Sequence, residues 1–115
     1  MSINDLEVIQ TTKLIALQSA SSTWTFNFCN VIKSGKAITI QLEAVATTNT
    51  STIQIADFKT KIGDMFQQTV HALVDSSGLI KKGYTDFNGN TLRLIMGENF
   101  TTGTTLSFLL TYILR

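Results

Sequence analysis

The chain has 115 residues with no proline, of which 43% are hydrophobic and 15% charged, and its formal net charge is +1. A chain of this size forms one domain with a single core, and it is too hydrophobic and too weakly charged to stay disordered. The near balance of 9 basic and 8 acidic residues gives no electrostatic footprint for nucleic acid.

Single copies of two reactive residue types narrow the chemistry further. One cysteine, Cys29, excludes an internal disulfide framework and a multi-cysteine zinc site, and one histidine, His71, excludes any site that needs two imidazoles within one chain. The first 18 residues mix Asp5, Glu7 and Lys13 with apolar residues, so we expect no secretory signal. No apolar run reaches the roughly 18 to 20 residues that span a bilayer, so we expect no membrane insertion.

The N-terminal stretch, residues 3–17, fits neither the helical nor the strand period, although residues 14–17 could open a strand. We therefore predict an N-terminal extension, such as the end of a neck, over residues 1–17. The β head domain is expected over residues 18–115.

The next two segments predict a β-hairpin. Residues 24–32 alternate so that Trp24, Phe26 and Phe28 share one face of a strand. The polar turn 33–36 contains Gly35, which can adopt the positive φ of a tight turn. Residues 37–46 alternate again, with an inward row at Ile38, Ile40, Leu42 and Ala44.

The remaining strands are short and separated by glycines. A polar loop over 47–51 precedes a short strand at 52–56, and strands at 83–87, 90–96 and 105–114 are predicted to form a meander. Asn88-Gly89 is the strongest turn dipeptide, because it favours positive φ at both centres. The last strand is apolar on both parities, so we expect core on one face and a partner on the other.

Residues 57–75 allow two readings. The apolar residues from Phe58 to Leu73 follow the helical period, Asp57 could serve as an N-cap, and Gly78 lies just past a helix end. Against a helix stand Gly63 in its interior, several β-branched residues, and alternation at residues 70, 72 and 74. The period alone favours the helix.

The sequence offers little for catalysis. A triad would have to use His71, and Cys29 is interpreted as a small apolar residue that packs on a sheet face. The eight carboxylates are interpreted as solvated or capping groups, with no converging acid–base pair. The calcium-loop-like start at Asp86 lacks the glutamate required at position twelve. We therefore expect no enzymatic activity, no cofactor and no metal.

Saccharide binding is better supported, because sugars are recognised by aromatic platforms flanked by amide, carboxylate or guanidinium groups. The candidate ligand-binding residues around the predicted turn are Tyr84, Asp86, Asn88, Asn90 and Arg93. Arg93 lies between two leucines, so its charge must face solvent, a ligand or an acidic partner. His71 and Trp24 complete the set. The alternatives are a solvated polar hairpin, a surface or interface histidine and a core tryptophan.

Three stretches carry a resemblance to a known family: residues 31–40 (VIKSGKAITI), 83–94 (GYTDFNGNTLRL) and 106–113 (LSFLLTYI). Their layout over residues 22–115 resembles the C-terminal receptor-binding heads of tail-fibre and baseplate proteins from lactococcal phages. The resemblance implies a homotrimer of antiparallel β-sandwich or barrel-like heads, carried on a neck, that binds host cell-wall saccharides or glycerol-phosphate groups without catalysis. It also implies an irregular loop and a strand at 69–74 in place of a long helix, although relatives often carry proline in that loop and this chain has none.

Two functions follow as hypotheses. The first is a virion protein at the phage tail tip or baseplate that attaches to a host cell-surface saccharide, with other baseplate or tail proteins as partners. The alternative is a structural virion or baseplate module whose sheet faces serve only assembly. The fold class expected in both cases is mainly β, an antiparallel sandwich or barrel-like head with room for one short helix.

Overall fold

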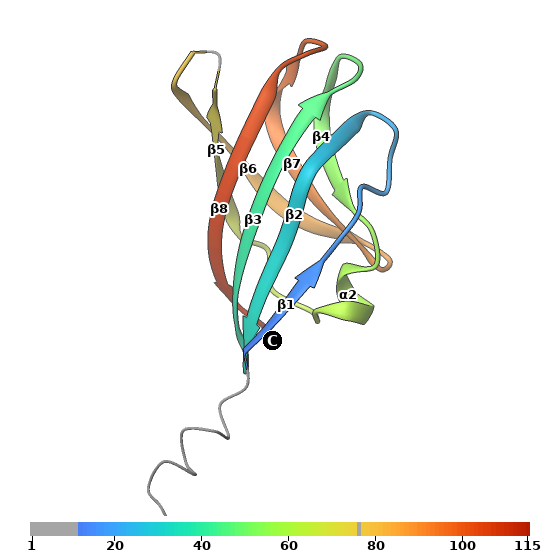
Figure 1. Ribbon diagram of the computed structural model, residues 1–115, viewed down its shortest axis with the longest axis vertical. Coiled ribbons are helices and arrows are strands. Elements are labelled where there is room, and N and C mark those ends of the chain that lie inside the picture. The colour runs from blue at the N-terminus through green and yellow to red at the C-terminus, as the bar shows by residue number, and fades with distance from the viewer. Residues whose placement is uncertain (1–11, 76) are drawn as a thin grey trace, which may run out of the picture.

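The computed structural model describes residues 12–75 and 77–115. This part of the chain folds into eight strands and one helical turn (Figure 1). In chain order these are β1 (Thr12–Ala16), β2 (Trp24–Ser34), β3 (Ala37–Ala46), β4 (Thr50–Ile55), α2 (Phe58–Lys61), β5 (Thr69–Val74), β6 (Leu79–Asn88), β7 (Thr91–Phe100) and β8 (Thr105–Ile113). The expectation of a mainly β head with one short helix is confirmed.

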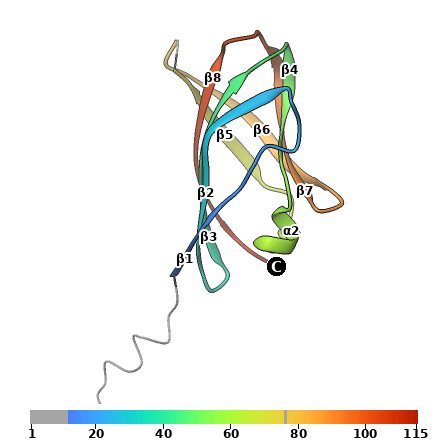
Figure 2. The same cartoon turned by 45° about the vertical axis from the view of Figure 1, so that its right-hand side comes forward.

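The strands form one antiparallel sheet in the order β1-β2-β3-β8-β5-β6-β7-β4, and this sheet curls around a core (Figure 2). Its two ends meet because the segment after β1 runs beside β4. Ser19 forms a bridge with Ile55, and the Ala20 N–H donates to the Gln54 carbonyl at 2.9 Å. The barrel-like closure gives the β4 edge a partner and leaves fewer unpaired backbone groups.

The hairpin of β2 and β3 is confirmed. Ser34 pairs with Ala37 around a two-residue turn in which Gly35 has φ 59°. Every second residue of β3 from Ile38 to Ala46 is buried, as the period of two requires. The sequence therefore specified this hairpin through both its turn and its apolar pattern.

A β-bulge in β2 corrects one detail of that hairpin. Phe26 pairs with Ala44 but Phe28 pairs with Glu43, so the strand gains one residue between them. A bulge reverses the inward and outward parity of everything that follows. Phe28 is therefore exposed, and the prediction that it shares a face with Trp24 and Phe26 was wrong. Cys29 turns inward and is buried, as its interpretation as a packing residue expected.

The C-terminal strands are only partly a meander. β6 and β7 pair around a two-residue turn, but β8 leaves this hairpin and pairs with β3 and β5. The turn residues are Gly89 and Asn90, and only Gly89 has a positive φ, so the expectation of positive φ at both Asn88 and Gly89 was wrong. The long-range pairing of β8 with β3 cannot be read from local turn signals.

The long-helix reading of residues 57–75 was wrong, and the loop-plus-strand reading is confirmed. Only the single turn α2 is helical, and β5 occupies residues 69–74. Gly63 adopts φ 140°, which ends the helical path, and β5 is held by pairing with β6 and β8. Asp57 precedes α2 but makes no side-chain capping hydrogen bond.

Residues 12–16 of the expected extension form β1, which pairs with β2, and residues 1–11 lie outside the described part of the chain. The core fills the inside of the curled sheet. Its largest fully buried side chains include Trp24 and Phe58, packed with leucines and isoleucines from β3, β4 and β7. Every charged side chain of the described residues is at least partly exposed, whereas Thr85 is buried, with 1% of its surface exposed.

Candidate functional site

An ion pair on the outer face of β6 and β7 forms the centre of the candidate site. Asp86 and Arg93 lie directly opposite each other in the β6–β7 register. Arg93 Nε donates to Asp86 Oδ1 at 2.7 Å, and Arg93 Nη2 donates to Asp86 Oδ2 at 2.6 Å. This is the bidentate geometry in which guanidinium and carboxylate planes match. Of the three predicted surroundings for the charge of Arg93, which were solvent, a ligand or an acidic partner, the structure shows the acidic partner, Asp86.

The pair stays accessible and keeps unused hydrogen-bonding capacity. About a third of each side chain is exposed, 35% for Arg93 and 33% for Asp86. A guanidinium has five N–H donors, and Asp86 uses two of them. The hydrogen bond that Arg93 donates to Asp86, together with the negative charge of that carboxylate, raises the pKa of Arg93, so the guanidinium remains charged at any working pH.

Tyr84 adds an aromatic surface on the same face. It precedes Asp86 by two residues on β6 and therefore points outward as Asp86 does. Its side chain is 45% exposed. In the sheet it lies between Thr69 of β5 and Ile95 of β7, which are its register partners. An exposed ring next to convergent donors and acceptors can bind a flat, hydroxyl-bearing ligand such as a sugar.

The sequence sets this face through its neighbours. Leu92 and Leu94 are fully buried, so Arg93 between them must point outward. Gly83 lets β6 and β7 approach closely, because a Cβ at this position would lie 2.3 Å from the Ile95 carbonyl oxygen. No residue with a side chain fits that backbone without a shift.

The two asparagines do not join the pair as one cluster. Asn88 is exposed at the end of β6, with the outward parity of Asp86. Asn90 instead holds α2: its Oδ1 accepts the Thr60 N–H at 2.7 Å, and its Nδ2 donates to Asp57 Oδ1 at 3.3 Å. The role of Asn90 in ligand binding stays a prediction, and the two hydrogen bonds of its side chain secure the helical turn.

The inclusion of Trp24 among the ligand-binding residues is corrected. Its side chain is only 2% exposed and packs edge-on against Phe100, with ring centroids 6.3 Å apart. A ring buried in this way offers no platform to a ligand. Its indole N–H has no hydrogen-bond partner among the described residues. The core interpretation of Trp24 holds, because its side chain faces the inside of the curled sheet at the first residue of β2.

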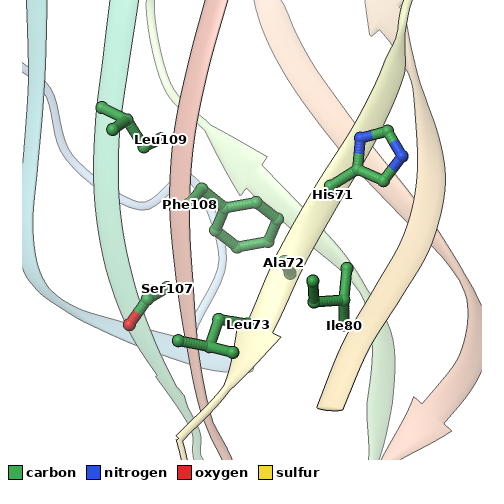
Figure 3. A pocket seen from close by; sticks show the side chains of 7 residues that line it. All are labelled: His71, Ala72, Leu73, Ile80, Ser107, Phe108 and Leu109. Carbon is green, nitrogen blue, oxygen red and sulfur yellow. The ribbon is translucent and has the colours of Figure 1, made fainter. Parts of the chain in front are cut away.

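His71 lies apart from the pair, at a shallow groove on the outer face between β5, β6 and β8 (Figure 3). The groove has a volume of about 380 Å³ and is lined mainly by apolar residues, among them Leu73, Ile80 and Leu109. Leu109 is 72% exposed and Ile80 is 68% exposed. The interpretation of His71 as a surface residue fits this position, because its side chain is exposed on the outer face of β5, directly opposite Lys82 of β6.

The groove exists because β5 and β8 pair over a short stretch only. Their ladder joins Leu73 to Ser107 and Val74 to Leu106. Further along, the two strands are linked by a side chain: the Tyr112 hydroxyl donates to the Thr69 carbonyl at 2.7 Å. Sequence reasoning pointed to Leu109 through the two-sided apolar pattern of the last strand. It missed Leu73 and Ile80, which only the β5–β6 pairing places beside it.

The thiol of Cys29 is poorly suited to act as a nucleophile. Burial raises the pKa of the Cys29 thiol to about 12, so the nucleophilic thiolate is scarce at neutral pH. Among residues 12–75 and 77–115, no three metal-binding side chains of the His, Cys, Asp and Glu types gather in one place. Within the same residues, no helix has the length and apolar character to cross a membrane.

The sequence matches no protein-family model and no curated protein. Solved structures similar to this chain are crystal structures of the fibre head domain of the Atadenovirus snake adenovirus 1. One has a TM-score of 0.43 at 7% identity and covers 89% of this chain and 94% of that chain. Another has a TM-score of 0.42 at 10% identity and covers 89% and 88%. A likeness at this level assigns neither a family nor a function.

Proposed function

We propose that this chain is a non-enzymatic head domain that attaches a virion to a saccharide on the host cell surface. The observation that carries the proposal is the exposed Tyr84 ring beside the bidentate Arg93–Asp86 pair. The resemblance of residues 22–115 to receptor-binding heads of lactococcal phages supports the same role and suggests the phage tail tip or baseplate as its location.

The chemistry of the pair favours uncharged sugar hydroxyls over phosphate at this face. Arg93 is already matched in charge by Asp86, so a phosphate group would have to compete with a carboxylate at 2.6 Å. A hydroxyl can instead accept from a free guanidinium N–H and donate to Asp86. The apolar face of a sugar ring would stack on Tyr84, which points outward from the same strand.

We propose further that the apolar groove beside His71 is covered by a neighbouring copy in a homotrimer. Leu109 and Ile80 expose 72% and 68% of their surface, and burying such side chains stabilises an assembly by about 1.5 to 3 kcal/mol each. Three copies on one shaft would also strengthen a weak single-site interaction with a cell surface through effective concentration.

The same groove favours a second candidate function, a structural virion or baseplate module. Here the apolar residues would contact other baseplate or tail proteins, and the face of Tyr84 would remain solvated. The two functions differ in one property: the structural module would ignore host cells and free saccharides.

The experiment is a glycan array of bacterial cell-wall saccharides and glycerol-phosphate polymers, probed with the wild-type chain and three variants. Tyr84→Ala and Arg93→Ala should each weaken binding about tenfold or more, because each removes a direct contact. Phe28→Ala is the matched control, since Phe28 is an aromatic residue of nearly equal exposure, 44%, on the distant strand β2. Binding that drops equally in all three variants, or in none, contradicts this site, and no binding by the wild type favours the structural module.

A further inference from the structure

A second, chemically different pocket lies at the end of the barrel where β1 begins. It is lined by Lys13 and Ile15 of β1, Lys33 of β2, the turn residue Gly35, and Lys61 of α2. Three of the chain's seven lysines thus border one cavity of about 250 Å³. In Figure 1 the start of β1, the β2–β3 turn, α2 and the C-terminus gather at this same end.

Two of these lysines face each other in the sheet. Lys13 and Lys33 are direct partners in the β1–β2 register, so their side chains project from the same face. Like charges placed directly opposite in neighbouring strands repel and destabilise the pairing. Lys61, from the last residue of α2, brings a third ammonium group to the same cavity.

No carboxylate of the described residues neutralises these ammonium groups. The ion pairs formed within residues 12–75 and 77–115 are Lys81 with Glu98, Arg93 with Asp86, and Arg115 with Asp64. None of the three pocket lysines takes part in them. The pocket therefore concentrates positive charge that the described fold does not balance.

One of the lysines is held in place. Lys33 Nζ donates to the Ile62 carbonyl at 2.7 Å, in the segment that follows α2, and its side chain is half-buried. An ammonium group has three N–H donors, so two remain for a ligand. A fixed donor loses little entropy on binding, which favours a specific ligand over a diffuse counterion.

We propose that this pocket binds a phosphate group. A compact dianion or phosphodiester would accept hydrogen bonds from several ammonium groups at once and remove the repulsion between Lys13 and Lys33. The volume suffices for such a group with some water, since a water molecule's share of the liquid is about 30 Å³. This site is separate from the face of Tyr84, so either one can exist without the other.

The test is thermal unfolding of the intact chain at constant ionic strength, with chloride replaced by inorganic phosphate. Wild type should gain roughly 5 °C at a tenfold excess of phosphate over its dissociation constant. Lys13→Gln and Lys61→Gln should each weaken the phosphate affinity about tenfold. Lys82→Gln is the matched control, because it removes the same charge from the exposed outer face of β6 and should retain the wild-type response.

Two further arms complete the design. Glycerol 1-phosphate carries a terminal phosphate, whereas poly(glycerol phosphate) carries phosphodiester groups inside a chain. Stabilisation by the first alone indicates a site for a free phosphate, and stabilisation by both indicates a pocket open at both sides, which also admits a phosphodiester within a polymer. The double variant Asp5→Asn, Glu7→Gln tests whether the chain's own N-terminal carboxylates occupy the site. A phosphate response that appears only in this double variant, equal responses in all lysine variants, or no response in wild type overturns the proposal.

Discussion

Two neighbouring parts of the outer surface differ in how their chemistry is completed. On β6 and β7, Arg93 and Asp86 satisfy each other through two hydrogen bonds and remain about one third exposed. On β5 and β8, Leu109 and Leu73 border a groove and have nothing to cover them within the described residues. Both faces belong to one curled sheet, and Tyr84 of β6 lies between them.

The difference indicates two kinds of association. A hydrated, self-neutralised ion pair costs little to leave in water and suits reversible contacts with a polar ligand. Exposed leucine and isoleucine side chains gain roughly 25 cal/mol for each Å² removed from water, which favours a lasting protein contact. The fold thus separates a surface that can be left wet from a surface that is better covered.

The largest effect is expected from charging the groove. Leu109→Asp should dissociate the proposed homotrimer into a species of 12.6 kDa, because each interface would bury an unpaired carboxylate. Sedimentation measures the mass, and circular dichroism confirms that the sheet is retained. Thr25→Asp places the same charge on the exposed side of β2 and should leave the assembly intact. A wild-type chain that is already a single 12.6 kDa species contradicts the covered groove.

A large loss of stability is expected when Gly83 of β6 is substituted. Gly83→Ala should lower the free energy of unfolding by about 2 to 3 kcal/mol, since the new Cβ would meet the Ile95 carbonyl oxygen at 2.3 Å. Gly97→Ala is the control on the paired strand, because its Cβ would have only one ordinary contact, at 3.8 Å. Denaturant unfolding compares the two, and equal losses would show that backbone crowding at Gly83 is unimportant.

The sequence predicts those parts of the fold that depend on local patterns. Alternation between Ile38 and Ala44 specified β3, and Gly35 specified the turn before it. Arg93 was placed on the outer surface by the two leucines beside it. Each of these inferences uses residues a few positions apart, where the period of side-chain directions carries the information.

The failures depend on contacts that are distant in sequence. The helical period from Phe58 onward predicted a helix, but β5 pairs with β6 and β8 instead. This pairing depends on residues outside 57–75, so the segment alone does not predict it. The bulge before Phe28 reversed which side chains of β2 face inward, and no glycine or other turn residue in the sequence indicates its position. The hydrogen bond at 2.7 Å from the Thr60 N–H of α2 to Asn90 could not be inferred either, because it joins residues that are 30 positions apart.

A smaller effect is expected when the ion pair loses its charge. Asp86→Asn should weaken saccharide binding about tenfold, because the amide cannot accept both Arg93 hydrogen bonds and leaves the guanidinium unbalanced. Stability should change by less than about 1 kcal/mol, as is usual for an exposed pair. Glu98→Gln is the control, since it neutralises the other exposed pair, with Lys81 at 2.9 Å. Glycan-array titration measures both variants, and an unchanged Asp86→Asn titration would remove Asp86 from the site.

The smallest effect at moderate pH concerns two buried side chains on other strands, Cys29 of β2 and Tyr112 of β8. Burial raises the pKa of Cys29 from 9.0 to about 12 and the pKa of Tyr112 from 10.0 to about 12. Both groups are neutral when protonated, so the folded state holds these protons while the unfolded state releases them. Their contribution is complete below about pH 9 and is lost as the pH rises toward 12.

The free energy of unfolding should therefore fall above pH 9, by at most about 1.4 kcal/mol per pH unit for each group. Cys29→Ala lowers stability at every pH by leaving a small cavity, but it should reduce the slope between pH 9 and 10. In the unfolded chain the thiol, with a pKa of 9.0, is more ionised over this interval than the Tyr112 hydroxyl, with a pKa of 10.0, which contributes equally in wild type and variant. Denaturant unfolding at pH 7, 9 and 10 gives the slope directly. An identical slope in wild type and variant would mean that the thiol ionises equally in both states, and Cys29 would then not be shielded by the barrel wall.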